Sequence, residues 1–214
     1  MEKQTKNNKS AASKSGNASP KKNSGAKKSS LAEANGTQET PMLEKFIVDS
    51  LKDIYYAEKQ LLKALPKMNK AATTPELKQA FQKHTTVTQE QIARLDQVFE
   101  MMGKRAQGKK CEAMEGLIKE SESAIEDTEA GSKTRDVALI MAAQKVEHYE
   151  IASYGGLVQI TKTMGKQEVS DLLAQTLAEE KETDQLLTDI AENNINLQAQ
   201  EEGGSEVEEG ETEE

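Results

Sequence analysis

The sequence predicts an all-α fold built from four long helices and one short helix. Apolar residues recur at spacings of three and four through most of residues 41–197. No segment alternates apolar and polar residues for long enough to indicate a strand. A charged fraction of 30% and only four prolines fit long solvated helices better than a sheet. We therefore expect a helical bundle.

Proline and glycine predict the limits of the first two long helices. The first is predicted over residues 41–68, with Pro41 at its first helical position. The second is predicted over residues 75–102, capped by Thr74 and ended by Gly103. The short turn between them makes these helices antiparallel neighbours.

A long connection separates this pair from the second pair, and it contains the short helix, predicted near residues 112–127. Thr134 is the predicted cap of the next helix, which continues to Gly165. The last helix carries apolar residues from Val169 to Ile190. Two antiparallel pairs joined by one long crossover form a ferritin-like four-helix bundle. A plain up-down bundle is less favoured, because its connections are usually about two to eight residues long.

The two ends of the chain differ from the middle in charge. Residues 1–40 hold eight Lys and three Glu, and residues 198–214 hold eight Glu and no basic residue. Both segments have few apolar residues to bury, so both are predicted to be disordered. The Lys-rich arm could contact nucleic acid through phosphates. We favour a solubilising role, because the arm has no arginine and no aromatic residue to stack on bases.

The remaining composition indicates a soluble, cytoplasmic protein. The single cysteine, Cys111, excludes an intramolecular disulfide and fits a reducing compartment. We interpret it as a thiol without a redox role. No apolar run approaches the roughly 18 residues of a membrane span, and no signal-peptide pattern opens the chain, so we expect no membrane partner.

Polar residues interrupt the apolar face of each long helix near its middle. On the first helix, Glu58 occupies a position where the spacing predicts leucine. The same interruption occurs on the other three long helices, at His84 and Gln91, then Gln144, Glu147 and His148, then Glu180 and Asp184. A buried carboxylate without a partner costs several kcal/mol or takes up a proton, so converging carboxylates usually share cations or protons. This layout is typical of a metal site in a bundle core.

Each of these residues also has a purely structural interpretation. Glu58 could extend its carboxylate to the surface, and His84 could be a core histidine with its hydrogen bonds satisfied. Gln91 and Gln144 could bond across the bundle without a metal. The metal hypothesis is favoured because Glu58 and its counterparts fall at a similar level in antiparallel helices.

Four segments of the predicted bundle form a recognisable series. They are DIYYAEKQLLKALPKM (53–68), KKCEAMEGLI (109–118), QKVEHYEIASYG (144–155) and EEKETD (179–184). Together they resemble the YciF/YciE type of bacterial ferritin-like stress proteins. The resemblance extends over residues 42–195 and implies a ferritin-like bundle, commonly a homodimer, with a role in stress responses.

The resemblance also implies a site like that of di-iron and di-manganese carboxylate proteins, which draw Glu and Glu-x-x-His ligands from four helices. The metal ligands expected here are Glu58, His84, Gln91, Glu147, Glu150, Glu180 and Asp184, and the expected metal is iron or manganese. Val87 stands where related sequences carry a glutamate that would bridge two ions, which predicts less than full occupancy by two metals.

Three functions follow from these expectations, and the net charge of −9 disfavours one of them, an architectural protein that associates with nucleic acid through the Lys-rich arm. The first is a stress-associated protein that binds divalent metal in its core, whose enzymatic activity, if it has one, is metal-dependent chemistry of peroxide or oxygen. The alternative is a metal-free structural or interaction protein with a degenerate site.

Overall fold

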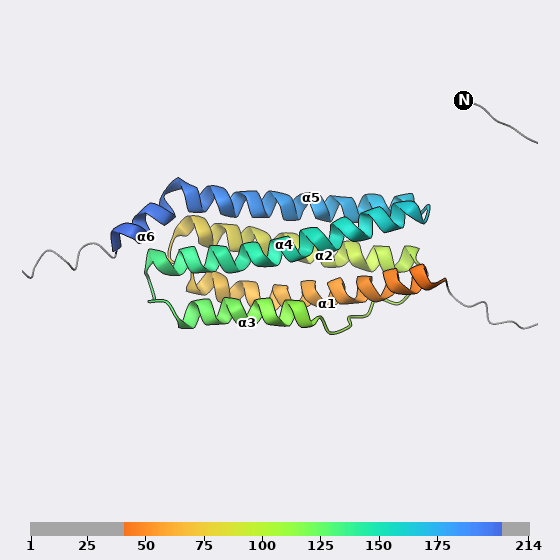
Figure 1. The fold of residues 1–214 in the computed structure, drawn as a ribbon, viewed down its shortest axis with the longest axis horizontal. Coiled ribbons are helices and arrows are strands. Elements are labelled where there is room, and N and C mark those ends of the chain that lie inside the picture. The colour runs from red at the N-terminus through yellow and green to blue at the C-terminus, as the bar shows by residue number, and fades with distance from the viewer. Residues whose placement is uncertain (1–40, 203–214) are drawn as a thin grey trace, which may run out of the picture. The chain divides into compact units, whose positions relative to one another are not determined.

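The computed structural model describes residues 41–202, in which four long helices lie side by side and a shorter helix covers one edge (Figure 1). The elements are α1 (Met42–Ala71), α2 (Pro75–Met101), α3 (Glu112–Glu126), α4 (Lys133–Thr163), α5 (Gln167–Ile190), a π-helical turn (Ala191–Ile195) and α6 (Asn196–Glu202). No strand occurs between residues 41 and 202, so the all-α class is confirmed. The predicted disordered arm, residues 1–40, lies outside the described residues.

The order of the long helices is ferritin-like. Helices α1 and α5 each pack against both α2 and α4, and α3 rests on α1 and α4. The crossover runs back along α1: Lys109 N donates to Lys52 O at 2.9 Å, and further along Lys67 Nζ lies 2.9 Å from Glu122 Oε1. Because the crossover returns in this way, α4 begins at the same end of the bundle as α2 (Figure 1). The predicted topology is therefore observed.

Glycine ends two of the long helices as predicted. Gly103 and Gly165 have φ values of 65° and 71°, a left-handed conformation that glycine adopts without steric cost. The predicted start of α4 was wrong by two residues. Ser132, not Thr134, is the cap, and its Oγ accepts from the backbone N of Arg135 at 3.1 Å.

Helix α6 extends the ordered chain beyond residue 198, where the sequence predicts the start of the acidic tail. The Glu202 carboxylate accepts hydrogen bonds from the backbone N of Lys133 at 2.7 Å and of Thr134 at 3.2 Å. A carboxylate at the N-terminus of α4 meets the positive end of the helix dipole, which accounts for this docking. Residues 203–214 of the predicted tail lie outside the described residues.

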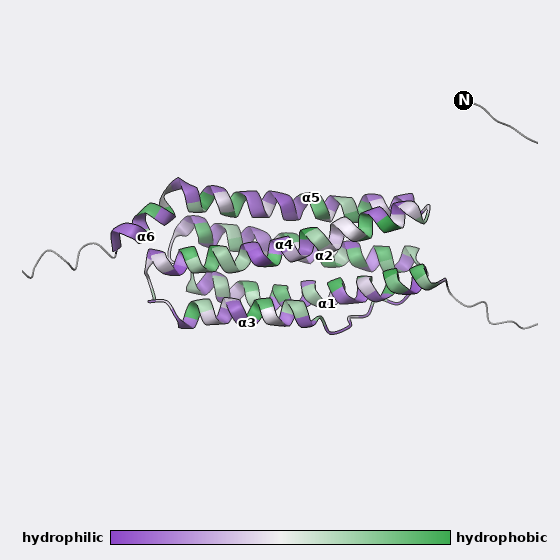
Figure 2. Ribbon diagram, in the orientation of Figure 1, coloured by the Kyte–Doolittle hydropathy of each residue, from purple (hydrophilic) through white to green (hydrophobic). Residues whose placement is uncertain are grey.

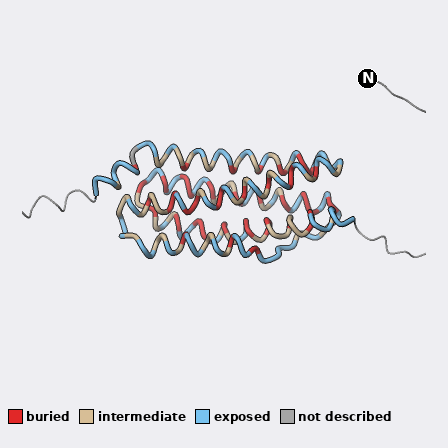
Figure 3. Tube along the Cα trace, viewed as in Figure 1, coloured by how far each residue is buried: buried red, intermediate tan, exposed pale blue. Residues whose placement is uncertain are grey.

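The core is a continuous column between the four long helices. Buried residues face the centre of the bundle and exposed residues face outward (Figure 3). Its largest fully buried apolar side chains are Ile47, Leu51, Ile54, Leu65, Leu77, Phe81, Leu95, Phe99, Met114, Leu139 and Ile140. Hydrophilic stretches nevertheless occur in the middle of α4 and α5 (Figure 2), at the level where the sequence predicts a polar site. No helix in residues 41–202 is long and apolar enough to cross a membrane.

Candidate metal centre

The unpartnered buried polar atoms of the described residues gather at the middle of the bundle. Seven side chains there bury nitrogen or oxygen atoms that have no hydrogen-bond partner: Glu58, His84, Thr88, Gln91, Glu147, Glu150 and Glu180. Six of them are among the predicted site residues, and Thr88 is the addition. Their helices are α1, α2, α4 and α5, so all four walls of the bundle contribute.

Four of these residues form a tight group. One ligand atom from each of His84, Glu147, Glu150 and Glu180 lies within 4.8 Å of the corresponding atoms of the other three. Glu147 and Glu150 share a face of α4, because residues three apart in a helix are neighbours. His84 Nδ1 lies 3.4 Å from Glu147 Oε1, while His84 Nε2 has no partner.

The spacing and the donor types fit a divalent cation. Nitrogen and oxygen ligands lie about 2.0–2.2 Å from a first-row divalent ion, so opposite ligands are about 4 Å apart. A separation of up to 4.8 Å needs only a small contraction of the side chains. One imidazole nitrogen and several carboxylate oxygens are a donor set that iron(II), manganese(II) and similar ions accept.

Glu58, on α1, is outside this group but close enough for its charge to raise the pKa of Glu150 and Glu180. Its side chain is fully buried, and the Tyr154 hydroxyl donates to its Oε1 at 2.5 Å. The second carboxylate oxygen, Oε2, has no partner. Tyr154 therefore holds Glu58 by one oxygen and leaves the other free.

Burial dominates the electrostatics of the centre. Loss of solvent raises the pKa of Glu58 to about 7. Burial, and then repulsion among neighbouring carboxylates, raises the pKa of Glu150 and Glu180 well above the ordinary value, and the pKa of Glu147 is raised mainly by burial. Burial lowers the pKa of His84 to about 4, so its imidazole is neutral near pH 7 and keeps a lone pair for a metal.

Gln91 is buried at the same level, and its Nε2 donates to Glu179 Oε2 at 3.2 Å. Its carbonyl oxygen, Oε1, is buried without a partner. A carbonyl oxygen is an uncharged ligand for oxygen-preferring cations.

Asp184 is not part of the four-residue group. It lies one turn beyond Glu180, its side chain is 24% exposed, and Oδ1 accepts from Gln144 Nε2 at 3.2 Å. The exposed His148 ring lies 3.4 Å from the same oxygen. Asp184 contributes negative charge near Glu147 while its own carboxylate bonds to α4.

Val87, at the position where the resemblance implies a bridging glutamate, is half-buried. The polar residues of α2 that are buried are His84, Thr88 and Gln91, which follow one another at four and three residues. As a result, α2 contributes only neutral donors to the centre, whereas α1, α4 and α5 contribute carboxylates.

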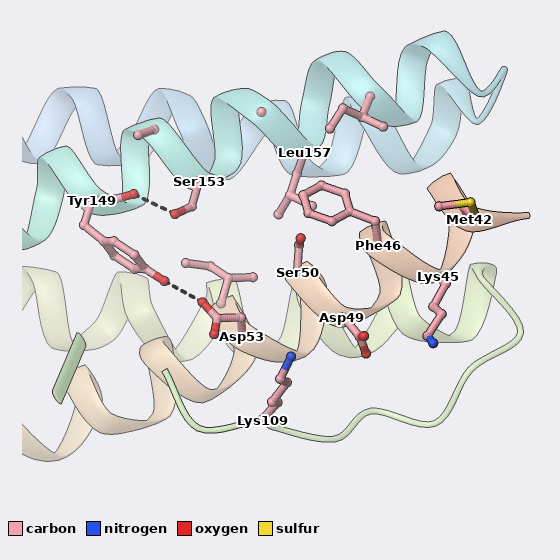
Figure 4. A pocket seen from close by; sticks show the side chains of 14 residues that line it. Met42, Lys45, Phe46, Asp49, Ser50, Asp53, Lys109, Tyr149, Ser153 and Leu157 are labelled. Atoms are coloured by element: carbon pink, nitrogen blue, oxygen red, sulfur yellow. Dashed lines mark hydrogen bonds between the residues drawn. The ribbon is translucent and has the colours of Figure 1, made fainter. Parts of the chain in front are cut away.

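A groove of about 710 Å³ lies between the first turns of α1 and the second half of α4 (Figure 4). None of the four grouped residues lines it. At its inner end the Tyr149 hydroxyl donates to Asp53 Oδ2 at 2.9 Å and lies 3.0 Å from Cys111 Sγ. The buried Cys111 caps α3 by accepting from the backbone N of Met114, and burial raises the pKa of its thiol, which disfavours the reactive thiolate.

Sequence reasoning did not identify Thr88, Tyr154, Arg94 or Glu179 at this centre. Thr88 had a usable signal, because it completes the His84–Gln91 face at helical spacing. Tyr154 is indistinguishable from an ordinary core tyrosine until its partner is known. Arg94 and Glu179 read as surface charges, because their pairing crosses from α2 to α5.

A profile for a domain of unknown function, DUF892, matches residues 42–200. Protein YciF of Escherichia coli K12 is 48% identical over 159 residues, which is 74% of this chain and 95% of that protein. The chain belongs to the YciF-type family.

Solved structures of relatives agree with this assignment. The E. coli stress protein YciF matches with a TM-score of 0.70 at 48% identity, over 73% of this chain and 99% of that one. YcfI of Rhodopseudomonas palustris, for which a structural role has been suggested, matches with a TM-score of 0.67 at 41% identity, over 72% and 97% of the two chains.

Proposed function

We propose that this YciF-type protein binds one or two divalent iron or manganese ions at the carboxylates of its bundle core, as part of a bacterial stress response in the cytoplasm. The observation that supports this is the gathering of the unpartnered buried polar atoms of residues 41–202 at a single centre. Folded proteins leave few such atoms, so a cluster of them needs a common explanation. A cation satisfies carboxylate, imidazole and amide oxygen donors together.

The donor set also limits which metal is expected. His84 would supply the nitrogen, and Glu147, Glu150 and Glu180 would supply the oxygens, with Glu58 Oε2 and Gln91 Oε1 beside them. Iron(II) and manganese(II) accept such mixed, oxygen-rich sites, whereas thiolate-preferring ions find no sulfur ligand among these residues. A bound iron or manganese ion would supply one-electron chemistry with oxygen or peroxide. The surrounding apolar residues exclude water from the centre.

The test is metal analysis of protein purified without chelator, followed by titration with Mn²⁺ and, without oxygen, Fe²⁺. We expect about one ion per chain or more in the wild type. Glu180→Gln keeps the shape of the side chain and removes a ligand charge, so the affinity should fall at least ~10-fold, the smaller end of losses seen for supporting residues around metals. Glu182→Gln is the matched control, because Glu182 is exposed two residues further along α5 and should bind metal like the wild type.

A metal-free structural role is the second candidate, favoured by the absence of a carboxylate at Val87 and by the role suggested for the R. palustris relative. In that case the wild type holds no metal after loading, and the buried carboxyls are satisfied by protons.

The family resemblance also leads us to infer a homodimer, for which light scattering would give twice the mass of one chain.

A further inference from the structure

The two ends of the Gln91 amide have different surroundings. Nε2 faces Glu179, to which it donates at 3.2 Å, and Oε1 is buried without a partner. A carboxylate can only accept hydrogen bonds, so the amide must present its NH₂ group to Glu179. Reversing the amide would place its carbonyl oxygen against a carboxylate oxygen. Glu179 therefore determines which end of Gln91 remains for the centre of the bundle.

Glu179 is itself held in place by Arg94. Arg94 Nη2 donates to Glu179 Oε1 at 2.8 Å, and Nη1 donates to Glu179 Oε2 at 2.8 Å. Nη1 also donates to Thr176 Oγ1 at 2.7 Å. A two-pronged arginine–carboxylate pair fixes orientation as well as distance. The side chain of Arg94 is only 14% exposed, so this pair is shielded more than an ordinary surface ion pair.

We propose that Arg94 and Glu179 are positioning residues that hold the Gln91 amide with its carbonyl oxygen toward the metal centre. This inference rests on the proposed metal binding. An amide nitrogen has no free lone pair to give to a cation, whereas the carbonyl oxygen has two. The orientation of the amide thus decides whether Gln91 is a metal ligand.

A positioning role and a purely electrostatic role of Arg94 predict opposite changes in cation affinity when Arg94 is replaced. Arg94 is a cation near Glu58, and its charge favours the ionised form of that carboxyl. Replacing a nearby cation with a neutral side chain should strengthen cation binding if charge alone matters. If Arg94 acts by holding Glu179 and Gln91, the same replacement should weaken cation binding.

The first experiment measures Mn²⁺ affinity by competition with a chelator. We expect Arg94→Met to bind Mn²⁺ ~10-fold more weakly than the wild type, as is usual when a supporting residue is lost. Lys83→Met is the matched control, because Lys83 is also on α2 and pairs with Glu182 of α5 at 2.8 Å, but both side chains are exposed. The control should bind at least as tightly as the wild type. Equal or tighter binding by Arg94→Met would overturn the proposal.

Two further variants test whether Arg94 changes the Mn²⁺ affinity through Gln91. Gln91→Leu removes the proposed ligand, so adding Arg94→Met to it should cause no further loss of affinity. Full additivity of the two losses would overturn the proposal. If Arg94→Met does not fold, Arg94→Lys keeps the charge without the two-pronged contact, and it should also weaken Mn²⁺ binding.

A measurement without metal separates this inference from the proposed function. The Gln91 side-chain NH₂ signals of the ¹⁵N-labelled protein are identified by their loss in Gln91→Leu. We expect them to shift and to exchange faster with water in Arg94→Met, but not in Lys83→Met. Unchanged signals in Arg94→Met would overturn the positioning role of Arg94 and Glu179 and would leave the proposed metal binding standing. Absence of Mn²⁺ binding by the wild type would overturn the proposed function and, with it, the ligand role of Gln91.

Discussion

At the scale of single residues, the centre is defined by four fully buried glutamates, Glu58, Glu147, Glu150 and Glu180. An isolated ionised carboxylate is too costly to bury, so each must be neutralised by a proton, a hydrogen bond or a cation. Only Glu58 receives a hydrogen bond from a neutral donor, the Tyr154 hydroxyl. The other three have no such donor, so protons and cations compete for them directly.

Val87 allows a sharp test of how charge limits metal content. Val87→Glu adds a carboxylate to α2, the one wall of the bundle that now contributes only neutral donors. Two nearby divalent ions repel, and an added carboxylate compensates part of that repulsion. We expect Val87→Glu to hold more metal per chain than the wild type under identical loading, measured by elemental analysis.

Thr86→Glu is the control for this change, because Thr86 is an exposed neighbour on the same helix and the added charge is the same. It should leave the metal content unchanged. Two tightly held ions per chain in the wild type would show that position 87 is not needed for a two-metal site.

At the scale of elements, the ends of the helices are tied to one another by buried polar contacts. Asp136, in the first turn of α4, is fully buried and accepts from the backbone N of Thr73 at 2.6 Å and of Thr74 at 2.8 Å. The Thr74 hydroxyl donates to the same carboxylate at 2.6 Å. Asp136 thus fixes the turn between α1 and α2 against the start of α4.

Asp136→Ala should therefore destabilise the bundle without removing a metal donor. Each buried N–H group left without a partner costs about 1–3 kcal/mol, so we expect a loss of roughly 2–5 kcal/mol, measured by urea unfolding. Mn²⁺ stoichiometry at saturation should stay unchanged. Asp171→Ala, at an exposed position of α5, serves as the control, and an equal loss there would contradict the assigned role of Asp136.

The sequence predicts the helices well because their signals are local. Apolar spacing and the positive-φ glycines depend only on neighbouring residues, and Gly103 and Gly165 end their helices where predicted. The cap of α4 was misplaced because Ser132 and Thr134 are chemically similar. The extent of α6 could not be predicted, because Glu202 binds the start of α4, about 70 residues away in the chain.

The site was partly predictable for the same reason. A polar residue that interrupts the apolar stripe of a helix is predicted to face inward, and Glu58 and Gln91 are both buried. Asp184 lies at the edge of its stripe, where its neighbours on α4 decide its direction. The contacts of Tyr154 and of Arg94 join helices that are distant in sequence, so only the packed structure brings them together.

At the scale of the whole molecule, the buried centre should couple folding to pH. A group whose pKa is higher in the folded than in the unfolded state binds more protons when folded, so its contribution to stability is lost as pH rises. For Glu58 the loss begins near the ordinary value of 4.5 and is complete above about 7. Glu147, Glu150 and Glu180, whose pKa values are raised well above the ordinary value, extend the loss to higher pH.

His84 acts in the opposite direction. Its pKa is lowered from 6.5 to about 4, so the neutral ring stabilises the folded state above pH 6.5 and this stability is lost as pH falls toward 4. The effect of four carboxyls on the pH dependence of stability outweighs the effect of this one imidazole. The free energy of unfolding of the metal-free protein should therefore decrease from pH 5 to pH 8.

Two kinds of experiment, addition of Mn²⁺ and substitution of single glutamates, distinguish the pH dependence caused by the buried carboxyls from general charge repulsion in an acidic chain. Mn²⁺ takes the place of the protons, so the stability gained from saturating Mn²⁺ should grow with pH over the same range. Urea unfolding of the metal-free Glu150→Gln protein should show a smaller decrease from pH 5 to pH 8 than the wild type, because one titrating carboxyl is gone. Glu182→Gln removes the same charge from an exposed site and should keep the wild-type slope. A flat or rising stability of the metal-free wild type would mean that the glutamates are already ionised in the folded state, and the competition between protons and metal would then be absent.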